Sequence, residues 1–193
     1  CAGCVGDSKR CTSCIDYFYL FDSFCKAECP EGTWADSQTK MCLNCEKPCL
    51  NCISNAKTCT KCISQYFLKN NECLSDCGSG FWKNLADGTC AACSPPCAQC
   101  TLSSTLCSSC IYPYFLSSSH CVSYCPEGFY ADIIERDCKK CNKECFACSK
   151  ASSICTKCDG TTLYFYKNKC LLNCPSGTFS PNTEPKTCVD CEY

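Results

Sequence analysis

The chain has 193 residues, and its 32 cysteines lie well above the content that signals a disulfide scaffold. Its 18 basic and 19 acidic residues give a formal net charge of -1 and are scattered, which excludes a basic stripe for nucleic acid or an acidic tail. The aromatic residues (10 Phe, 10 Tyr and 2 Trp) are accompanied by few Val or Ile, so a conventional core of branched aliphatic side chains is not expected. No apolar run approaches the roughly 20 residues that span a bilayer.

The cysteines recur at a fixed period along the whole chain. Cys1, Cys49, Cys97 and Cys145 are 48 positions apart, and four copies of an eight-cysteine unit account for all 32 cysteines. A period of this length predicts a linear array whose units contact mainly their neighbours. The predicted repeats are 1–48, 49–96, 97–144 and a slightly incomplete fourth repeat, 145–193.

Each repeat begins with two C-x-x-C pairs and continues with an aromatic cluster before its fifth cysteine. The clusters lie at 17–21, 66–68, 112–116 and 163–166. Polar turns such as 69–72 and 117–120 bound them, and no stretch has sustained helical periodicity. This pattern predicts short β-hairpins with little or no helix.

The second half of each repeat contains a glycine turn. "CPEGTW", "CGSGFW", "CPEGFY" and "CPSGTF" place glycine at the same position, which predicts a turn with positive φ (Gly32, Gly80, Gly128, Gly177). An aromatic residue follows two positions later (Trp34, Trp82, Tyr130, Phe179). We expect these aromatics to pack on neighbouring disulfides; the alternative is a stripe that faces a ligand.

Three kinds of chemistry use cysteines at such spacings. Structural zinc takes four ligands from knuckles separated by a longer loop, whereas here the inner pairs are six residues apart and the chain has one histidine, His120. A redox motif normally occurs once, near a βαβ pattern. A disulfide ladder explains the composition best, because each short loop it closes contributes on the order of 3 kcal/mol. Disulfides persist in oxidising compartments, so we expect an extracellular location and no metal or other cofactor.

The repeat unit resembles a known extracellular module. Its pattern, C-x2-C-x6-C-x2-C-x10-C-x3-C-P-x-G-x-aromatic-x7-C-x2-C, is similar to the furin-like cysteine-rich repeat of growth-factor receptors, R-spondins and some proprotein convertases. The resemblance covers the whole chain, and the dense C-x-x-C usage is also similar to cysteine-rich surface antigens of protists. It implies a small disulfide-rich fold, a linear rod of four furin-like repeats built from short β-hairpins and knotted disulfides.

The family resemblance also implies a pairing for thirty cysteines, in which a two-disulfide knot is followed by two single-disulfide hairpins. The implied pairs are Cys1 with Cys11, Cys14 with Cys25, Cys29 with Cys42, Cys45 with Cys52, Cys49 with Cys59, Cys62 with Cys73, Cys77 with Cys90, Cys93 with Cys100, Cys97 with Cys107, Cys110 with Cys121, Cys125 with Cys138, Cys141 with Cys148, Cys145 with Cys155, Cys158 with Cys170, and Cys174 with Cys188.

The implied pairing leaves Cys4 and Cys191, one near each end. Each is half of an incomplete knot, and the expected partners are adjoining repeats or copies of the chain, end to end. In one interpretation the array continues and the 193 residues are part of a longer chain. In the other, Cys191 of one copy bonds Cys4 of the next, and a contact that does not close makes a filament.

No catalytic constellation is evident, and we expect no enzyme activity. His120 stands in a serine-rich turn without a nearby acidic residue, and Glu135 with Asp137 is typical of a solvated turn. The main hypothesis is an extracellular structural or surface-coat role. The alternative is a segment of a receptor or matrix protein that binds a protein ligand through exposed aromatics such as Tyr112, Tyr114 and Phe115. Serine- and threonine-rich stretches, including 101–109 and 116–120, are candidates for O-linked glycans.

Overall fold

The computed structural model describes residues 1–7, 9–160, 162–181 and 185–192. These residues form short strands and turns and contain no helix, so none of them belongs to a helix long and apolar enough to cross a membrane. The chain divides into two compact units, Cys1–Ala92 and Cys93–Tyr193. The expected disulfide-rich β structure built from short hairpins is confirmed.

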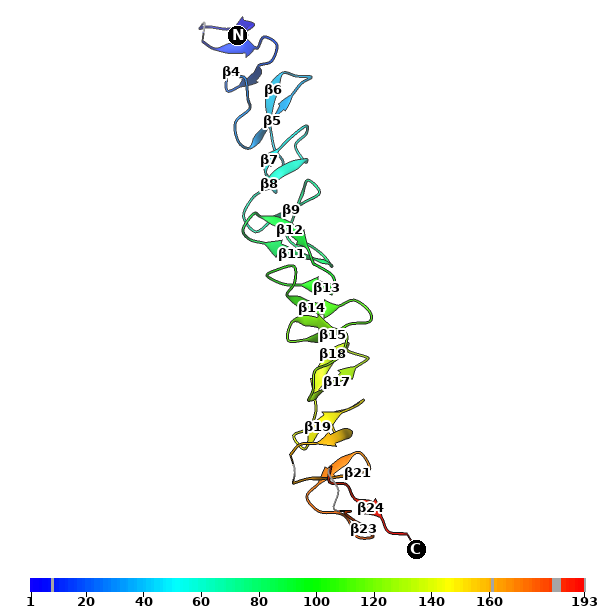
Figure 1. Cartoon of the computed structure of the whole chain (residues 1–193). Helices are drawn as coiled ribbons and strands as arrows, with labels where there is room; N and C mark the ends of the chain where they lie inside the picture. Colours follow the sequence, from blue (N-terminus) through cyan, green and yellow to red (C-terminus); the bar gives the residue numbers. More distant parts are fainter. Residues whose placement is uncertain (8, 161, 182–184, 193) are drawn as a thin grey trace. The chain divides into compact units, whose positions relative to one another are not determined.

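In its described residues, 1–7 and 9–92, the first unit contains twelve strands in four small sheets (Figure 1). The strands are β1 (Gly3–Cys4), β2 (Cys11–Ser13), β3 (Tyr19–Phe21), β4 (Phe24–Lys26), β5 (Thr33–Asp36), β6 (Met41–Asn44), β7 (Cys49–Cys52), β8 (Cys59–Cys62), β9 (Phe67–Lys69), β10 (Glu72–Leu74), β11 (Phe81–Asn84) and β12 (Thr89–Ala92). Two-stranded sheets β1-β2 and β7-β8 alternate along the chain with four-stranded sheets of order β4-β3-β6-β5 and β10-β9-β12-β11.

The second unit continues this alternation in the third repeat, whereas the strands of the fourth repeat form only two-stranded sheets in the described residues. Its strands are β13 (Cys97–Cys100), β14 (Cys107–Cys110), β15 (Phe115–Ser117), β16 (His120–Val122), β17 (Phe129–Asp132), β18 (Asp137–Lys140), β19 (Cys145–Cys148), β20 (Cys155–Cys158), β21 (Tyr164–Tyr166), β22 (Lys169–Leu171), β23 (Thr178–Phe179) and β24 (Val189–Asp190). The four-stranded sheet has the order β16-β15-β18-β17, and β13-β14, β19-β20, β21-β22 and β23-β24 are separate pairs.

The hairpin turns explain why these residues form strands of only two to four residues. The turn of the first hairpin after each knot has positive φ at two consecutive residues in all four repeats (Asp22 and Ser23, Asn70 and Asn71, Ser118 and Ser119, Lys167 and Asn168). Two such residues form the tight turn whose twist matches antiparallel strands. The predicted positive φ at Gly32, Gly80, Gly128 and Gly177 is also confirmed, with values between 78° and 82°.

Two backbone hydrogen bonds recur in every repeat. The amide of the third cysteine donates to the second residue of the hairpin turn, at 2.8 Å in each repeat (Cys11 to Ser23, Cys59 to Asn71, Cys107 to Ser119, Cys155 to Asn168). The amide at the centre of the next strand donates across to the second hairpin, at 2.8 to 2.9 Å (Leu20 to Lys40, Leu68 to Gly88, Leu116 to Arg136, Phe165 to Lys186). The repeats therefore share one backbone plan.

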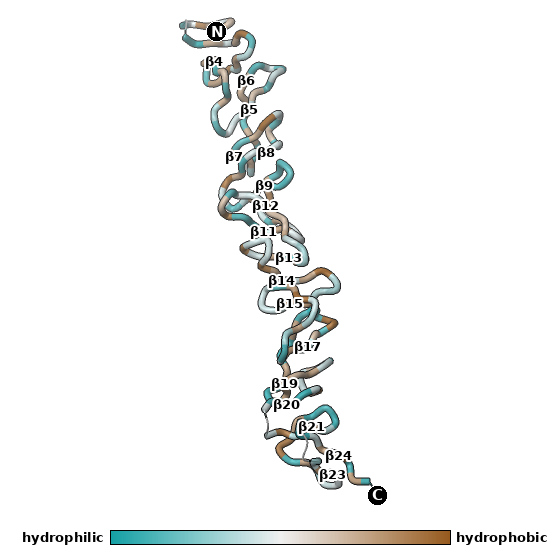
Figure 2. Tube along the Cα trace, viewed as in Figure 1, coloured by the Kyte–Doolittle hydropathy of each residue, from teal (hydrophilic) through white to brown (hydrophobic). Residues whose placement is uncertain are grey.

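Sulfur forms most of the core. Thirteen of the fourteen buried hydrophobic residues in the described part are cysteines, and the other is Phe67. Trp34 packs against the cluster of Cys49, Cys52 and Cys59, and Tyr130 packs against the cluster that contains Cys145. For these two aromatics the expected packing on neighbouring disulfides is confirmed. Hydrophobic residues are accordingly spread in short stretches along each unit (Figure 2).

Candidate functional site

The disulfides are the chemical groups that dominate the structure, and all 32 cysteines lie in its described part. Fifteen disulfides join the same residues that the family resemblance implies, with Cα–Cα separations of 5.1 to 5.7 Å, the usual span of a disulfide. Each repeat is thus held together by short loops that disulfides close, and these loops replace the aliphatic core that the chain lacks.

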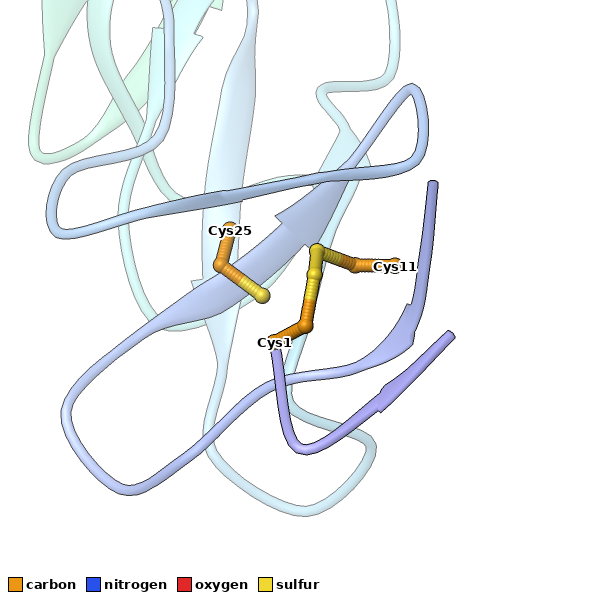
Figure 3. A group of neighbouring side chains, drawn as sticks. All are labelled: Cys1, Cys11 and Cys25. Atoms are coloured by element: carbon orange, nitrogen blue, oxygen red, sulfur yellow. A yellow bond between two sulfur atoms is a disulfide. The ribbon is translucent and has the colours of Figure 1, made fainter. Parts of the chain in front are cut away.

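Neighbouring disulfides also meet one another. In the first repeat the sulfurs of Cys1, Cys11 and Cys25 lie within 4.8 Å of one another, which brings the Cys14–Cys25 hairpin against the Cys1–Cys11 bond (Figure 3). The second and third repeats have the equivalent groups (Cys49, Cys59 and Cys73; Cys97, Cys107 and Cys121). Because every one of these sulfurs is in a disulfide, none offers the thiolate that zinc binds. These groups serve as packing.

Cys4 and Cys191 form no disulfide in the chain, and both are exposed. Cys4 pairs with Cys11 across β1 and β2, in the register that Cys52 has with Cys59. The amide of Cys191 donates to Gly177 at 2.9 Å, as the amide of Cys45 donates to Gly32 at 2.8 Å. Cys4 therefore stands where Cys52 stands in a complete knot, and Cys191 stands where its partner Cys45 stands.

The acidic residues of the β17–β18 turn form an ion-paired group. Carboxylate oxygens of Asp132, Glu135 and Asp137 lie within 4.8 Å of one another, and the Lys139 ammonium donates to Asp132 and Glu135 at 2.7 Å each. The bond from Lys139, with two from turn amides, lowers the pKa of Asp132, and the same carboxylates raise the pKa of Lys139. The Lys139 ammonium thus offsets part of the negative charge of this turn.

The single histidine lies apart from these carboxylates in the sequence, at the first residue of β16. His120 is exposed, and its Nδ1 lies 3.0 Å from the carbonyl oxygen of Ser118, two residues earlier. This contact belongs to the hairpin turn itself.

The aromatic residues singled out from the third repeat differ in exposure. Tyr112 is exposed, whereas Tyr114 and Phe115 are half-buried. The Arg136 guanidinium lies 5.1 Å from the Tyr112 ring and 5.6 Å from the Phe115 ring, and it donates to the carbonyl of Tyr114 at 2.7 Å. Arg136 thereby anchors the 111–114 loop, a contact that the sequence pattern did not reveal.

The equivalent pair of positions holds different residues in each repeat. The first position is the second residue after the fourth cysteine of the repeat. The second position is the residue of the second hairpin whose carbonyl accepts the recurrent hydrogen bond described above, such as Lys40 or Arg136. In the first repeat they hold Asp16 and Lys40, an ion pair at 3.8 Å. They hold Ser64 with Gly88, Tyr112 with Arg136, and Gly160 with Lys186 in the other repeats. This pair of positions is the variable element on the shared backbone.

No protein-family model matches the chain. A stretch of 49 residues, 25% of the chain, is 39% identical to human proprotein convertase subtilisin/kexin type 5, of which it covers 3%. The chain therefore spans a small part of this curated relative. Some proprotein convertases contain the furin-like repeats that the motifs resemble, so the match supports the resemblance over this stretch. Together with the disulfides, it indicates a disulfide-rich repeat region of the extracellular type.

Proposed function

We propose that the chain is a non-catalytic extracellular scaffold, a segment of a surface coat or matrix made of tandem disulfide-stapled repeats. The observation that carries this proposal is the recurrence of one backbone plan, with the same two hydrogen bonds in all four repeats. A core made of sulfur needs neither a cofactor nor a closed pocket to remain folded, which suits a spacer.

The scaffold extends through its two incomplete knots. Cys191 and Cys4 have the backbone positions of two residues that bond within a complete knot. Their partners are cysteines of adjoining repeats in a longer polypeptide or, in the filament hypothesis, the Cys4 and Cys191 of other copies. Serine- and threonine-rich loops of the third repeat are exposed at several positions, which supports O-linked glycosylation there.

A denaturing gel of native material with blocked thiols, run with and without reductant, tests the extension. A ladder that collapses on reduction to the mass of this chain, 21.2 kDa, is expected for copies joined through Cys191 and Cys4. A species that stays large after reduction indicates repeats in one polypeptide and removes the covalent filament. Labelling of intact cells with a membrane-impermeant reagent tests the location, and a chain labelled only after permeabilisation contradicts the scaffold proposal.

The second candidate function is binding of a protein ligand. It is favoured by the third repeat, in which Tyr112 is exposed beside other apolar side chains, unlike its counterparts Asp16, Ser64 and Gly160. Loss of binding to a protein partner on substitution of Tyr112, without loss of the disulfides, tests this candidate.

A further inference from the structure

In the second repeat, one sulfur of the hairpin disulfide lies against the knot disulfide. The Cys73 sulfur is within 4.8 Å of the sulfurs of both Cys49 and Cys59, which are bonded to each other. The bonding partner of Cys73 itself is Cys62. The third and first repeats have the same arrangement (Cys121 beside the Cys97–Cys107 bond; Cys25 beside the Cys1–Cys11 bond, Figure 3). A thiolate formed at Cys73 therefore has a second disulfide beside it.

Hydrogen bonds hold this hairpin against the knot. The Cys59 amide donates to the Asn71 carbonyl at 2.8 Å, and the Asn71 side-chain amide donates to the Cys59 carbonyl at 3.1 Å. Asn71 is two residues before Cys73, so these bonds keep the Cys73 sulfur beside Cys59. Cys49, Cys59 and Cys73 also line a cleft of about 280 Å³, which gives the sulfurs room to change partners without displacing packed side chains.

The two disulfides differ in their exposure to solvent. Cys49 and Cys59 are 6% and 3% exposed, whereas Cys62 and Cys73 are half-buried. The rate of thiol–disulfide exchange depends on access to the attacked sulfur, so a dissolved thiol reaches the hairpin bond more readily than the knot bond. The position of Cys73 offers a second route to the buried bond, from inside the repeat.

We propose that a small thiol opens the buried knot disulfide of the first three repeats indirectly, by exchange at the hairpin disulfide. In the second repeat the small thiolate attacks Cys62 and forms a mixed disulfide there, and the electron pair of the broken bond leaves on Cys73. The Cys73 thiolate then attacks Cys59. A Cys59–Cys73 bond forms, and the electron pair of the broken knot bond leaves on Cys49, which takes up a proton. Each step breaks one disulfide and forms another, so no oxidant is needed.

The exchanged bond costs little in chain entropy. The Cys49–Cys59 bond spans 10 residues, and Cys73 is 14 positions after Cys59. Loop closure depends on the logarithm of this number, so the two bonds constrain the unfolded chain almost equally. The cost lies in packing, because Trp34 packs against the cluster that contains Cys49 and Cys59. A repeat that has exchanged therefore loosens at the knot. This chemistry does not depend on the proposed scaffold role.

The fourth repeat provides a comparison within the same chain. Its knot cysteines, Cys145 and Cys155, and its hairpin cysteine Cys170 line an equivalent cleft of about 190 Å³. All three belong to the described part of the chain, but their sulfurs do not form a group within 4.8 Å of one another. Cys170 is also 12 positions from its partner Cys158, whereas Cys73 is 11 positions from Cys62. We therefore expect the knot bond of the fourth repeat not to exchange.

Disulfide mapping of two single-serine variants tests the second step without any added thiol. The parent is the Cys4→Ser, Cys191→Ser chain, in which every remaining cysteine has a disulfide partner. Cys62→Ser leaves Cys73 as the free thiol of the second repeat, and Cys158→Ser is the matched control that leaves Cys170. Each chain is held at about pH 8, quenched with acid, unfolded and alkylated. Acid stops exchange because the attacking group is the thiolate and a free cysteine titrates near about pH 8.5.

The Cys62→Ser chain is expected to carry label on Cys49 as well as on Cys73 and to contain a Cys59–Cys73 bond. The label on Cys49 is expected to be at least tenfold greater than the label on Cys145 in the Cys158→Ser control. Label confined to Cys73, or equal label on Cys49 and Cys145, overturns the proposal.

Brief treatment of the parent chain with 2-mercaptoethanol is a second measurement, which does not require a hairpin variant to fold. After the same acid quench, molecules with the mercaptoethanol adduct on Cys62 are expected to carry their free thiol on Cys49. Molecules with an adduct on Cys158 are expected to carry it on Cys170. A free thiol that stays on Cys73, or adducts that reach Cys49 or Cys59 before the hairpin bond, overturns the proposal.

Discussion

Removal of a buried knot disulfide is expected to destabilise a repeat more than removal of the adjacent hairpin disulfide. In the second repeat the two bonds, Cys49–Cys59 and Cys62–Cys73, span 10 and 11 residues. Loop closure contributes about 2.7 kcal/mol for each of them, so chain entropy does not distinguish the two. Burial does, because Cys49 and Cys59 are 6% and 3% exposed, whereas Cys62 and Cys73 are half-buried.

Replacement of Cys49 and Cys59 by alanine also removes two buried sulfurs from the cluster against which Trp34 and Leu68 pack. Lost burial and the cavity left behind together add about 2 kcal/mol to the cost of the knot variant. The expected loss is therefore about 5 kcal/mol for the knot variant and about 3 kcal/mol for the Cys62→Ala, Cys73→Ala variant.

Native-state hydrogen exchange measures this difference locally. The amide of residue 59 donates to Asn71 and remains in both variants, and the amide of residue 155, which donates to Asn168, is an internal reference in the fourth repeat. The residue 59 amide is expected to exchange roughly thirtyfold faster in the knot variant than in the hairpin variant. Equal rates, or an equal change at residue 155, refute burial of sulfur as the local source of stability.

Three further outcomes follow from the contacts described above. Lys139→Met is expected to raise the pKa of Asp132 toward its ordinary value, and a carboxyl NMR titration measures this change. Because the folded pKa of Asp132 is lowered, its ionised carboxylate stabilises the protein at pH values above the unfolded pKa. This stabilisation is lost as the pH falls through the folded pKa. Arg136→Gln is expected to speed exchange of the Tyr114 amide about tenfold by removing the bond to the Tyr114 carbonyl and the Tyr112 contact, whereas Arg136→Lys, as in the first repeat, retains most of the protection. An alkylating reagent added to the isolated folded chain is expected to label Cys4 and Cys191, and a label on Cys59 contradicts the buried knot.

Much of the fold was predictable because it is local. The 48-residue period, the positive φ at Gly32 and its counterparts, and the short hairpins each depend on a few consecutive residues. The pairing of Cys45 with Cys52 and of Cys49 with Cys59 was different, since spacing alone permits many connectivities and only the family resemblance implied these bonds. The structure has those pairs.

The contacts between hairpins were not predictable from the pattern. The parallel pairing of Leu116 with Asp137 joins residues 21 positions apart, and no local periodicity indicates it. This pairing brings Arg136 to Tyr112 and places Ile133 at the same end of the sheet as Tyr124. The aromatic cluster at 112–116 therefore revealed a strand but not which of its residues remains exposed.

The variation at the Tyr112 position follows from the kind of core that the chain has. In a close-packed aliphatic core a change from tyrosine to glycine in a supporting loop alters the packing and the stability together. Here each loop is held by the disulfide that encloses it, such as Cys110–Cys121, and by the recurrent hydrogen bond to the second hairpin, such as Leu116 to Arg136. The side chains at these loops contribute little to the stability of the fold, so they differ between repeats. The first repeat has an ion pair, the second has two small residues, the third has a tyrosine ring beside an arginine, and the fourth has a cavity. A sulfur core thus separates the scaffold from its surface, which allows one backbone plan to carry different side chains at equivalent loops of successive repeats.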